Sequence, residues 1–310
     1  MYVPFRGCEL EVRHLKPMFD LGQLGLMPYS PRDERSIEQG LCNSDVVINM
    51  IGKHYETKHI VPTRRADGKL CRINYDFEEV HVDIPRRIAR LAKKNGVKSF
   101  IHVSALAADL ESSSKWCQTK AKGEIAVREE FPEAVIVKVA TMFGAEDRFL
   151  NWIAETADRL PFMPILNDGR TLVQPVHSVD VGKALMAIVR KHEAFAGKTF
   201  QLSGPHEYSY KELYEFVTDI TTKKKPMINI PTSVAAAIGK FSQELINPVW
   251  TEDFAAQLCE DVLPQDGMGH LGFDDLDIVP NSMDKVAFDY LHRYRPGGHF
   301  ATVEGYTVRG

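Results

Sequence analysis

The sequence predicts an α/β protein with a doubly wound parallel sheet, followed by a smaller and mostly helical C-terminal region. As far as residue 204, short apolar segments without polar alternation are interleaved with amphipathic segments of ten or more residues. This pattern is typical of parallel strands that helices cover on both faces. Helical patterns dominate from residue 210 onward. We therefore expect one domain at residues 1–145 and a second at 146–310, with residues 172–202 returning strands to the sheet.

The first domain contains the more regular pattern. Its strands are expected at residues 1–5, 24–28, 44–52, 99–104 and 134–144, and its helices at 32–42, 76–96 and from 112 onward. Pro85 and its neighbours Asp83 and Ile84 interrupt the second helix, so we expect a kink there. Residues 59–75 have turn residues and no clear period, which predicts an exposed loop.

The second domain is expected to begin with mixed elements and to end in helices. Helices are predicted at residues 147–160, 178–191, 210–221, 232–246, 251–261 and 282–294, and strands at 171–177 and 197–204. Ser178 and Ser209 are the expected N-caps of two of these helices. An apolar stripe, made of Val234, Ile238, Phe241 and Leu245, is usually core. It could also dock onto a subunit or lie at a membrane surface.

Composition excludes several classes of protein. Of 310 residues, 44% are hydrophobic and 26% charged, and 38 basic residues nearly balance 42 acidic ones. No overall field therefore draws the chain to nucleic acid. The five scattered cysteines favour a reducing compartment and disfavour structural zinc. His54 and His59 are five apart in a loop, which is poor metal geometry, so we expect no metal site.

Residues 112–124, SSSKWCQTKAKGE, place Trp116 four residues before Lys120. In a helix this spacing brings both side chains to one face. The preceding strand ends near Ser104. A strand, a serine and then a helix with this lysine resemble the extended and atypical short-chain dehydrogenase/reductases, in which Ser, Tyr and Lys act together. Trp116 occupies the tyrosine position, and indole does not titrate.

Longer segments carry a more specific resemblance. Seven segments are similar, in order, to the nucleotide-binding accessory subunits of mitochondrial respiratory complex I: residues 14–37, 46–58, 74–109, 112–116, 131–154, 173–185 and 197–217. The resemblance implies a noncatalytic subunit that holds NADPH. It also implies a peripheral position on the matrix side of the inner membrane, beside other subunits of the complex and with lipid within reach.

The glycine-rich strand–turn–helix that opens this Rossmann-like fold in the family has no counterpart here. Residues 21–25, LGQLG, have two glycines, Gly22 and Gly25, and they precede a predicted strand rather than follow one. We therefore do not expect a phosphate loop at these residues. The first strand of the sheet is missing from the predicted pattern, which would leave strand edges unpaired.

The resemblance also assigns cofactor-binding residues by position. Arg6 stands where members that prefer NADP place a cation against the ribose 2′-phosphate, and Ile51 and Gly52 follow a strand near the adenine ribose. Val103 and Ser104 would edge the nicotinamide side, and Lys120 would bind the nicotinamide ribose. Ordinary structural roles, such as a surface arginine, a strand-ending turn or a cap, remain open for each position except the lysine.

Two other functions stay open beside the accessory subunit. One is an active or vestigial NADP-dependent reductase or epimerase of the extended group, and the other is a nucleotide-sensing regulator. The first would need the tyrosine and the glycine loop. Nucleotide-sensing regulators also have an incomplete Tyr/Lys pair, but they lack the long segments of similarity given above. We therefore expect no catalytic residues and a structural role for NADPH.

Overall fold

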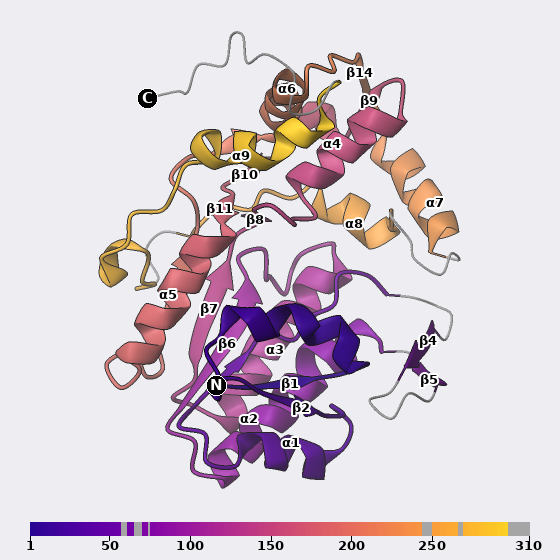
Figure 1. Ribbon diagram of the computed structural model, residues 1–310. Coiled ribbons are helices and arrows are strands. Elements are labelled where there is room, and N and C mark those ends of the chain that lie inside the picture. Colours follow the sequence, from indigo (N-terminus) through magenta and orange to yellow (C-terminus); the bar gives the residue numbers. More distant parts are fainter. Residues whose placement is uncertain (57–60, 65–69, 74, 244–249, 266–268, 297–310) are drawn as a thin grey trace.

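The computed structural model describes residues 1–56, 61–64, 70–73, 75–243, 250–265 and 269–296. A sheet with flanking helices occupies one half of the molecule, and helices α4 and α6–α9 lie over one end of it (Figure 1). Within the described residues no helix is both long and apolar enough to cross a membrane.

Four parallel strands form the central sheet, in the order β12-β7-β6-β3. They are β3 (Val46–Asn49), β6 (Ser99–Ala105), β7 (Val135–Val139) and β12 (Thr199–Leu202). Asn49 at the end of β3 lies opposite His102 of β6. Parallel strands end at the same edge of a sheet, so the carboxyl ends of β3 and β6 present their last residues together.

Helices cover both faces of this sheet, which confirms the doubly wound prediction. On one face α1 (Glu34–Leu41), α2 (Ile84–Lys94) and α3 (Lys115–Glu130) pack against Phe100 and Ile136. On the other face, α5 (Ser178–Arg190) packs against alternate residues of the strands, including Val137 and Phe200. Continuous apolar strands have this composition because both of their faces are buried.

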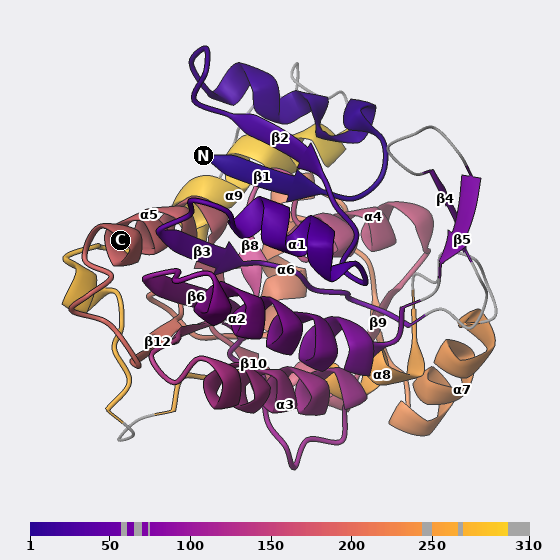
Figure 2. The ribbon, with the colours of Figure 1, turned by 90° about the horizontal axis from the view of Figure 1, so that it is seen from below.

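The first two strands, β1 (Tyr2–Phe5) and β2 (Gly25–Pro28), form a separate parallel pair, and β3 lies at the edge of the four-stranded sheet. A 3₁₀ helix, Glu9–Met18, connects β1 to β2. In the view of Figure 2, β2, β1, β3 and β6 follow one another. Both predicted strands are present.

The irregular point predicted near Pro85 is a change of helix type. Residues Glu79–Asp83 form a π-helical turn that runs into α2 at Ile84, and Pro85 lies in the first turn of α2. Proline is tolerated there because the first N–H groups of a helix have no intrahelical acceptor. The π-turn contacts α3 closely, since a Cβ built on Gly123 would lie 2.0 Å from the backbone oxygen of His81.

The prediction of an unstructured loop at residues 59–75 is wrong for two of its segments. Strands β4 (Val61–Arg64) and β5 (Leu70–Ile73) form an antiparallel pair. The remaining part of this insertion, apart from Tyr75, lies outside the described residues. Antiparallel pairing joins two nearby segments through backbone bonds, so it does not need a clear hydrophobic period.

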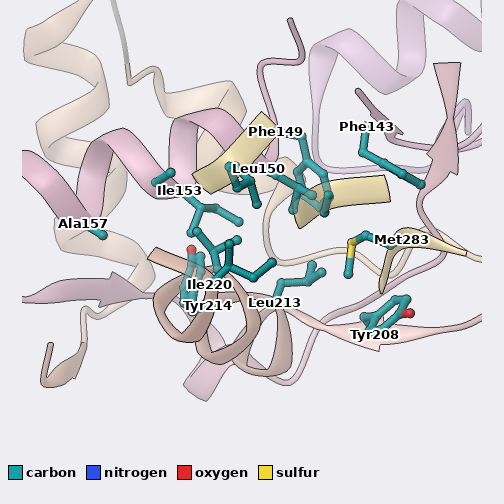
Figure 3. Close-up of a cluster of buried hydrophobic side chains, with 14 of the residues drawn as sticks. Phe143, Phe149, Leu150, Ile153, Ala157, Tyr208, Leu213, Tyr214, Ile220 and Met283 are labelled. Carbon is teal, nitrogen blue, oxygen red and sulfur yellow. The ribbon is translucent and has the colours of Figure 1, made fainter. Parts of the chain in front are cut away.

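A second core lies in the C-terminal half. Helices α4 (Leu150–Arg159), α6 (Tyr210–Thr221) and α9 (Met283–Leu291) surround it, with Leu150, Ile153, Leu213 and Met283 at its centre (Figure 3). Paired short strands border it: β8 (Met142–Phe143) with β11 (Val176–His177), β9 (Met163–Ile165) with β14 (Met227–Asn229), and β10 (Leu172–Val173) with β13 (Tyr208–Ser209). Three short 3₁₀ helices complete this half, at Asn167–Gly169, Asp274–Leu276 and His292–Tyr294.

Helices α7 (Thr232–Ser242) and α8 (Glu252–Gln257) pack against each other through small residues. Ala235 and Gly239 of α7 are buried, and a Cβ on Gly239 would lie 2.4 Å from the backbone nitrogen of Glu252. This packing turns the apolar stripe outward: Val234, Ile238 and Phe241 are 48%, 52% and 79% exposed. The expectation that the stripe is core is therefore wrong for these three residues, and Leu245 lies outside the described residues.

One of the two predicted N-caps is correct. Ser209 Oγ accepts a hydrogen bond from the backbone nitrogen of Glu212, and the Glu212 carboxylate accepts one from the backbone nitrogen of Ser209, so α6 begins with a capping box. The prediction for Ser178 is wrong, because His177 is the N-cap of α5. The Ser178 hydroxyl instead lies against Gly144, 2.7 Å from where that glycine's Cβ would be.

Candidate functional site

The carboxyl ends of β3 and β6 and the first turns of α3 border one polar region. The segment after β3 passes close to α3: a Cβ on Gly52 would lie 3.3 Å from Lys120 Nζ. The backbone nitrogen of Ile51 donates to Asn49 Oδ1 at 3.2 Å. The structure thus places Gly52, which follows Ile51, beside Lys120, and the assignment of these residues to a nucleotide stays a prediction.

Lys120 is a buried cation, 9% exposed. Its Nζ lies 5.6 Å from the centroid of the Trp116 ring, and no hydrogen bond or ion pair within the described chain satisfies it. Burial lowers the pKa of Lys120 to about 8, against a smaller opposing effect of Glu124. The site therefore holds an ammonium group whose N–H groups have no hydrogen-bond acceptor within the described residues.

Trp116 has a structural role here. Its Nε1 donates to the backbone oxygen of Lys53 at 2.8 Å, which ties α3 to the segment after β3. Its ring meets His81 edge-on at 6.1 Å between centroids. Trp116 therefore uses its one donor on the protein backbone, and it has no proton to exchange at ordinary pH.

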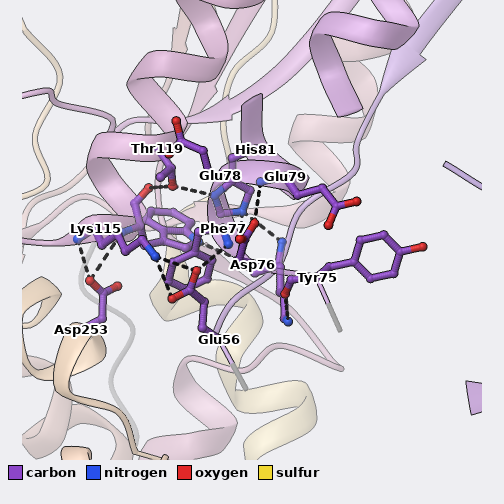
Figure 4. A network of polar contacts seen from close by, with 12 residues as sticks. Glu56, Tyr75, Asp76, Phe77, Glu78, Glu79, His81, Lys115, Thr119 and Asp253 are labelled. Carbon is purple, nitrogen blue, oxygen red and sulfur yellow. Dashed lines mark hydrogen bonds and ion pairs between the residues drawn. The ribbon is translucent and has the colours of Figure 1, made fainter. Parts of the chain in front are cut away.

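Two neutral histidines lie beside the lysine. Nδ1 of His81 is 2.9 Å from Thr119 Oγ1, and Nε2 of the same ring meets the backbone of Lys53 (Figure 4). His102 Nδ1 is 3.0 Å from Asn49 Nδ2, while its Nε2 has no partner within the described residues. Burial, with a further effect of Lys120, lowers the pKa of each histidine to about 3.

Val103 and Ser104 are neighbours on β6 and face opposite sides of the sheet. Val103 packs with the cluster beneath α5. Ser104 Oγ donates to Glu124 Oε1 of α3 at 2.5 Å, and Glu124 also pairs with Lys138 at 3.0 Å. The Ser104 hydroxyl is thus committed to α3, and its assignment to the nicotinamide side stays a prediction.

Arg6 lies at a second location, beside Tyr75. The guanidinium carbons of Arg6 and Arg32 lie 4.8 and 4.4 Å from the Tyr75 ring centroid. Arg32 is held by Glu79 through two contacts of 2.5 and 2.6 Å. Lys53 Nζ donates to the backbone oxygen of Tyr75. Tyr75 therefore links Arg6 to the segment that carries Gly52.

Two carboxylates from the C-terminal half occupy the N-terminus of α3. Asp253 Oδ1 accepts from the backbone nitrogen of Lys115 at 2.7 Å and from Ser114 Oγ at 3.1 Å. Glu260 accepts from Ser112 Oγ at 2.5 Å and from both Oγ and backbone nitrogen of Ser113 at 2.6 and 2.8 Å. These carboxylates satisfy donors that an anionic ligand would otherwise use.

Sequence reasoning missed His81, His102, Asp253 and Glu260. A histidine within an apolar strand, such as His102 in residues 99–104, is a signal that could have been followed. The two acids gave no local signal, since they lie 138 and 147 residues from their partners Lys115 and Ser113. His59 lies outside the described residues, and in the described part no three His, Cys, Asp or Glu side chains gather as a metal site.

Comparisons with a family model and with solved structures indicate the class of protein to which this fold belongs. Residues 108–259 match a family model described as the RmlD substrate binding domain. A nucleoside-diphosphate-sugar epimerase from Staphylococcus aureus has the same fold, with a TM-score of 0.66, 13% identity, and 91% of this chain and 88% of that chain covered. The parallel sheet and these matches define a Rossmann-like α/β protein, the fold that the resemblance to the extended short-chain dehydrogenase/reductases implies.

Curated relatives then give the family. A protein from Arabidopsis thaliana, named NADH dehydrogenase (ubiquinone) 1 alpha subcomplex subunit 9, mitochondrial, is 35% identical over 96% of this chain and 72% of its own length. Its namesake from Mus musculus is 36% identical over 94% of this chain and 73% of its own length. The chain belongs to this family of alpha subcomplex subunits.

A further solved structure shows the same fold with a nucleotide bound. UDP-glucuronic acid 4-epimerase from Bacillus cereus, in complex with UDP-glucuronic acid and NAD, has a TM-score of 0.58 and 14% identity. The alignment covers 91% of this chain and 86% of that chain. At this identity the likeness concerns the fold alone.

Proposed function

We propose that this chain is a noncatalytic accessory subunit of mitochondrial respiratory complex I that holds NADP(H) as a structural ligand. It lies peripherally on the matrix side of the inner membrane, against other subunits and within reach of lipid, and it has no nucleic-acid partner. The support for the complex is family membership, because relatives with the subunit name match at least 94% of the chain.

One observation carries the noncatalytic part of the proposal. Trp116 stands four residues before Lys120, where a catalytic tyrosine would stand, and its Nε1 is bonded to the Lys53 backbone. General acid–base catalysis needs a group that exchanges a proton near the operating pH and contributes about 10²–10⁴-fold to rate. The pair can therefore bind a ligand but lacks the proton donor for carbonyl reduction.

The residues of the site fit parts of a dinucleotide. Lys120 supplies an unsatisfied ammonium for ribose hydroxyls, and Gly52 permits close approach of a ligand to the backbone. Arg6 supplies a guanidinium for the 2′-phosphate. Gly22 has a φ of +83° in the turn before β2, so residues 21–25 lack the strand-then-helix context of a phosphate loop. NADP(H), when bound, supplies a nicotinamide that could carry hydride, but the proposal gives it a structural role.

The cofactor proposal is tested by identifying the nucleotide that the native complex releases on denaturation. We expect NADP(H), because a hydrogen bond to a charged group contributes about 1.5–3 kcal/mol. Arg6→Ala should accordingly weaken NADPH binding by roughly ten- to a hundredfold and leave NADH binding unchanged. Recovery of NADH alone, or an unchanged preference in the variant, contradicts the proposal.

The subunit proposal is tested on native gels of mitochondria. The chain should co-migrate with complex I, and its depletion should lower the amount of assembled complex. Complexes rebuilt with Lys120→Ala should retain electron transfer, and the isolated chain should show no carbonyl-dependent oxidation of NADPH. A soluble monomer, with none of the chain in the complex, contradicts the proposal. Turnover that disappears in Lys120→Ala contradicts its noncatalytic part.

A further inference from the structure

The N-terminus of α3 is bound by the C-terminal half through a set of contacts that we call the carboxylate latch, formed by Asp253 and Glu260. Asp253 lies in α8, and its Oδ2 accepts a hydrogen bond from Gln257 Nε2 at 2.9 Å. This hydrogen bond fixes the orientation of the Asp253 carboxylate. Glu260 follows α8 and binds the serines before α3. Helix N-termini attract negative charge because their first N–H groups lack intrahelical acceptors and their dipole is positive.

The helix held by this latch also carries the lysine of the candidate nucleotide site. Asp253 contacts Lys115, and Lys120 lies five residues further, or about 7.5 Å along the helix axis. At Gly123 the same helix abuts the backbone of the π-turn, which leaves no room for it to tilt in that direction. A shift of its N-terminus therefore changes where Lys120 points.

The first turn of α3 also holds the segment that faces Lys120. Lys115 Nζ pairs with Glu56 at 2.9 and 3.0 Å, and Glu56 accepts from the backbone nitrogen of Phe77 at 2.6 Å. Trp116 bonds the backbone oxygen of Lys53. Figure 4 shows Asp253, Lys115 and Glu56 as consecutive members of one network. The latch, α3 and residues 52–56 thus form a continuous set of contacts.

From this continuity we infer that Asp253 and Glu260 are positioning residues for the nucleotide site, and that nucleotide binding and seating of α8 are thermodynamically coupled through α3. The inference rests on the proposed function, since it requires a nucleotide beside Lys120. It explains why a chain without the catalytic tyrosine would keep this lysine: the bound nucleotide stabilises the position of the C-terminal helices.

The coupling has a measurable size and works in both directions. A ligand that prefers the seated arrangement raises its population, and seating raises the affinity for that ligand by the same factor. Couplings of this kind typically amount to about 5- to 150-fold. Removing the latch charges leaves the donors of residues 112–115 with weaker acceptors, so α3 loses part of its fixed position.

The test compares NADPH binding to the whole chain and to the double variant Asp253→Asn with Glu260→Gln, by calorimetry. We expect at least a fivefold weaker affinity in the double variant, although neither residue touches the nucleotide site. Glu252→Gln is the matched control, because this exposed carboxylate of α8 makes no hydrogen bond to α3, and its affinity should stay at the wild-type value. Asp253→Glu, which retains the charge, should recover part of the loss.

Hydrogen exchange of the wild-type chain supplies the reciprocal measurement. NADPH should slow exchange at residues 252–260 by the factor by which the double variant loses affinity. A merely structural latch would not produce this agreement. If wild type and double variant bind equally, or if NADPH leaves exchange at 252–260 unchanged, the inference is overturned while the proposed function stands. The exchange result decides the question if the double variant does not fold. A wild-type chain that binds neither NADPH nor NADH overturns the cofactor proposal itself and the inference with it.

Discussion

Lys120 is a charged group buried without a direct ion pair in the described chain, and such a group opposes folding. Its pKa is about 8 in the folded chain and close to 10.4 in an unfolded one. Between these values the unfolded chain binds a proton that the folded chain has released, so stability rises with pH across this window. Below pH 8 the full cost of burying the charge is present. Buried charges that destabilise the unliganded protein in this way are common at cofactor sites, where the bound ligand offsets the free energy of burying the charge.

We expect Lys120→Met to raise the free energy of unfolding at pH 7 by roughly 2–3 kcal/mol, because methionine fills a similar volume without a charge. The variant should also lack the rise in stability between pH 8 and 10. Urea denaturation of both proteins at several pH values measures this. Lys122→Met, on the exposed side of the same helix, should change stability by less than about 0.5 kcal/mol. A destabilised Lys120→Met would show that the ammonium has a protein partner.

His81 and His102 give a dependence of the same sign, but in the acid range. The pKa of each is about 3 when folded and near 6.5 when unfolded, so the unfolded chain binds more protons as pH falls below 6.5. Their contribution is complete above pH 6.5 and is lost as pH falls toward 3. At pH 5 each histidine should have removed roughly 2 kcal/mol of stability.

Denaturation at pH 7 and pH 5 tests this prediction, with His81→Gln and His102→Gln as variants. Each replacement should reduce the loss of stability between the two pH values by about half, whatever it does to stability at pH 7. An equally steep loss in both variants would mean that other groups, such as carboxylates, dominate acid unfolding.

At the scale of single elements, the contact between α3 and the π-turn is a tight constraint on the position of Lys120. A Cβ at Gly123 would approach the backbone oxygen of His81 to 2.0 Å, and backbone cannot move aside as a flexible side chain can. Packing of this kind admits glycine alone. It also fixes the distance between the helix of Lys120 and the element that carries His81.

Gly123→Ala should therefore destabilise the chain by about 3 kcal/mol, since overpacking forces backbone shifts. The matched control is Gly182→Ala in α5, where no described atom beyond the adjacent residues and the helix's own backbone lies within 4 Å of the added Cβ. That change should stabilise by about 0.5–1 kcal/mol, because alanine is the better helix former. Thermal or urea denaturation separates the two results. A neutral Gly123→Ala would show that α3 can move away from the π-turn.

Most elements could be predicted from hydrophobic pattern and turn residues, and the exceptions have physical reasons. Strands β3, β6 and β7 are rich in Val, Ile and Phe because both faces of the sheet are covered, so they are visible in the sequence. The π-turn depends on the contact with Gly123, and α5 takes His177 as its N-cap because the Ser178 side chain faces Gly144. These features are decided by tertiary contacts and leave no local signature.

At the scale of the molecule, the exposed face of α7 is the apolar surface for which a docking role was predicted. Val234, Ile238 and Phe241 point away from α8, and exposed apolar groups on one helix face commonly mark an interaction site. The division of the chain at residue 145 and the site assignments to Arg6, Ile51, Gly52, Val103, Ser104 and Lys120 remain predictions.

Phe241→Glu should weaken association with complex I by several kcal/mol, because the centre of an interface is desolvated. Less of the variant should then co-migrate with the complex. The melting temperature should stay unchanged, since Phe241 is largely exposed in the chain itself. Val279→Glu, at a position 89% exposed elsewhere on the molecule, is the matched control and should assemble normally. Normal assembly of Phe241→Glu would exclude this face from the interface.

The contacts between the two halves explain what sequence could not supply for the site. Spacing alone predicts that Trp116 and Lys120 share a helix face, and the family resemblance assigns Gly52 to the same nucleotide site. The carboxylate latch joins residues more than a hundred positions apart. Its members are ordinary surface-type acids until the fold places them at the end of α3. The same holds for Tyr75, whose link to Arg6 depends on the packing of β1.

The hydrogen bond from Trp116 to the Lys53 backbone has an optical consequence. Of the three tryptophans, Trp152 and Trp250 stack on each other, with ring centroids 6.0 Å apart, while Trp116 stands beside Lys120. Reduced nicotinamide absorbs light in the range where indole emits, and the oxidised form does not. Excitation of Trp116 would therefore pass by resonance transfer to a reduced nucleotide at Lys120, so the chain's intrinsic fluorescence would report occupancy by the reduced form without any added dye.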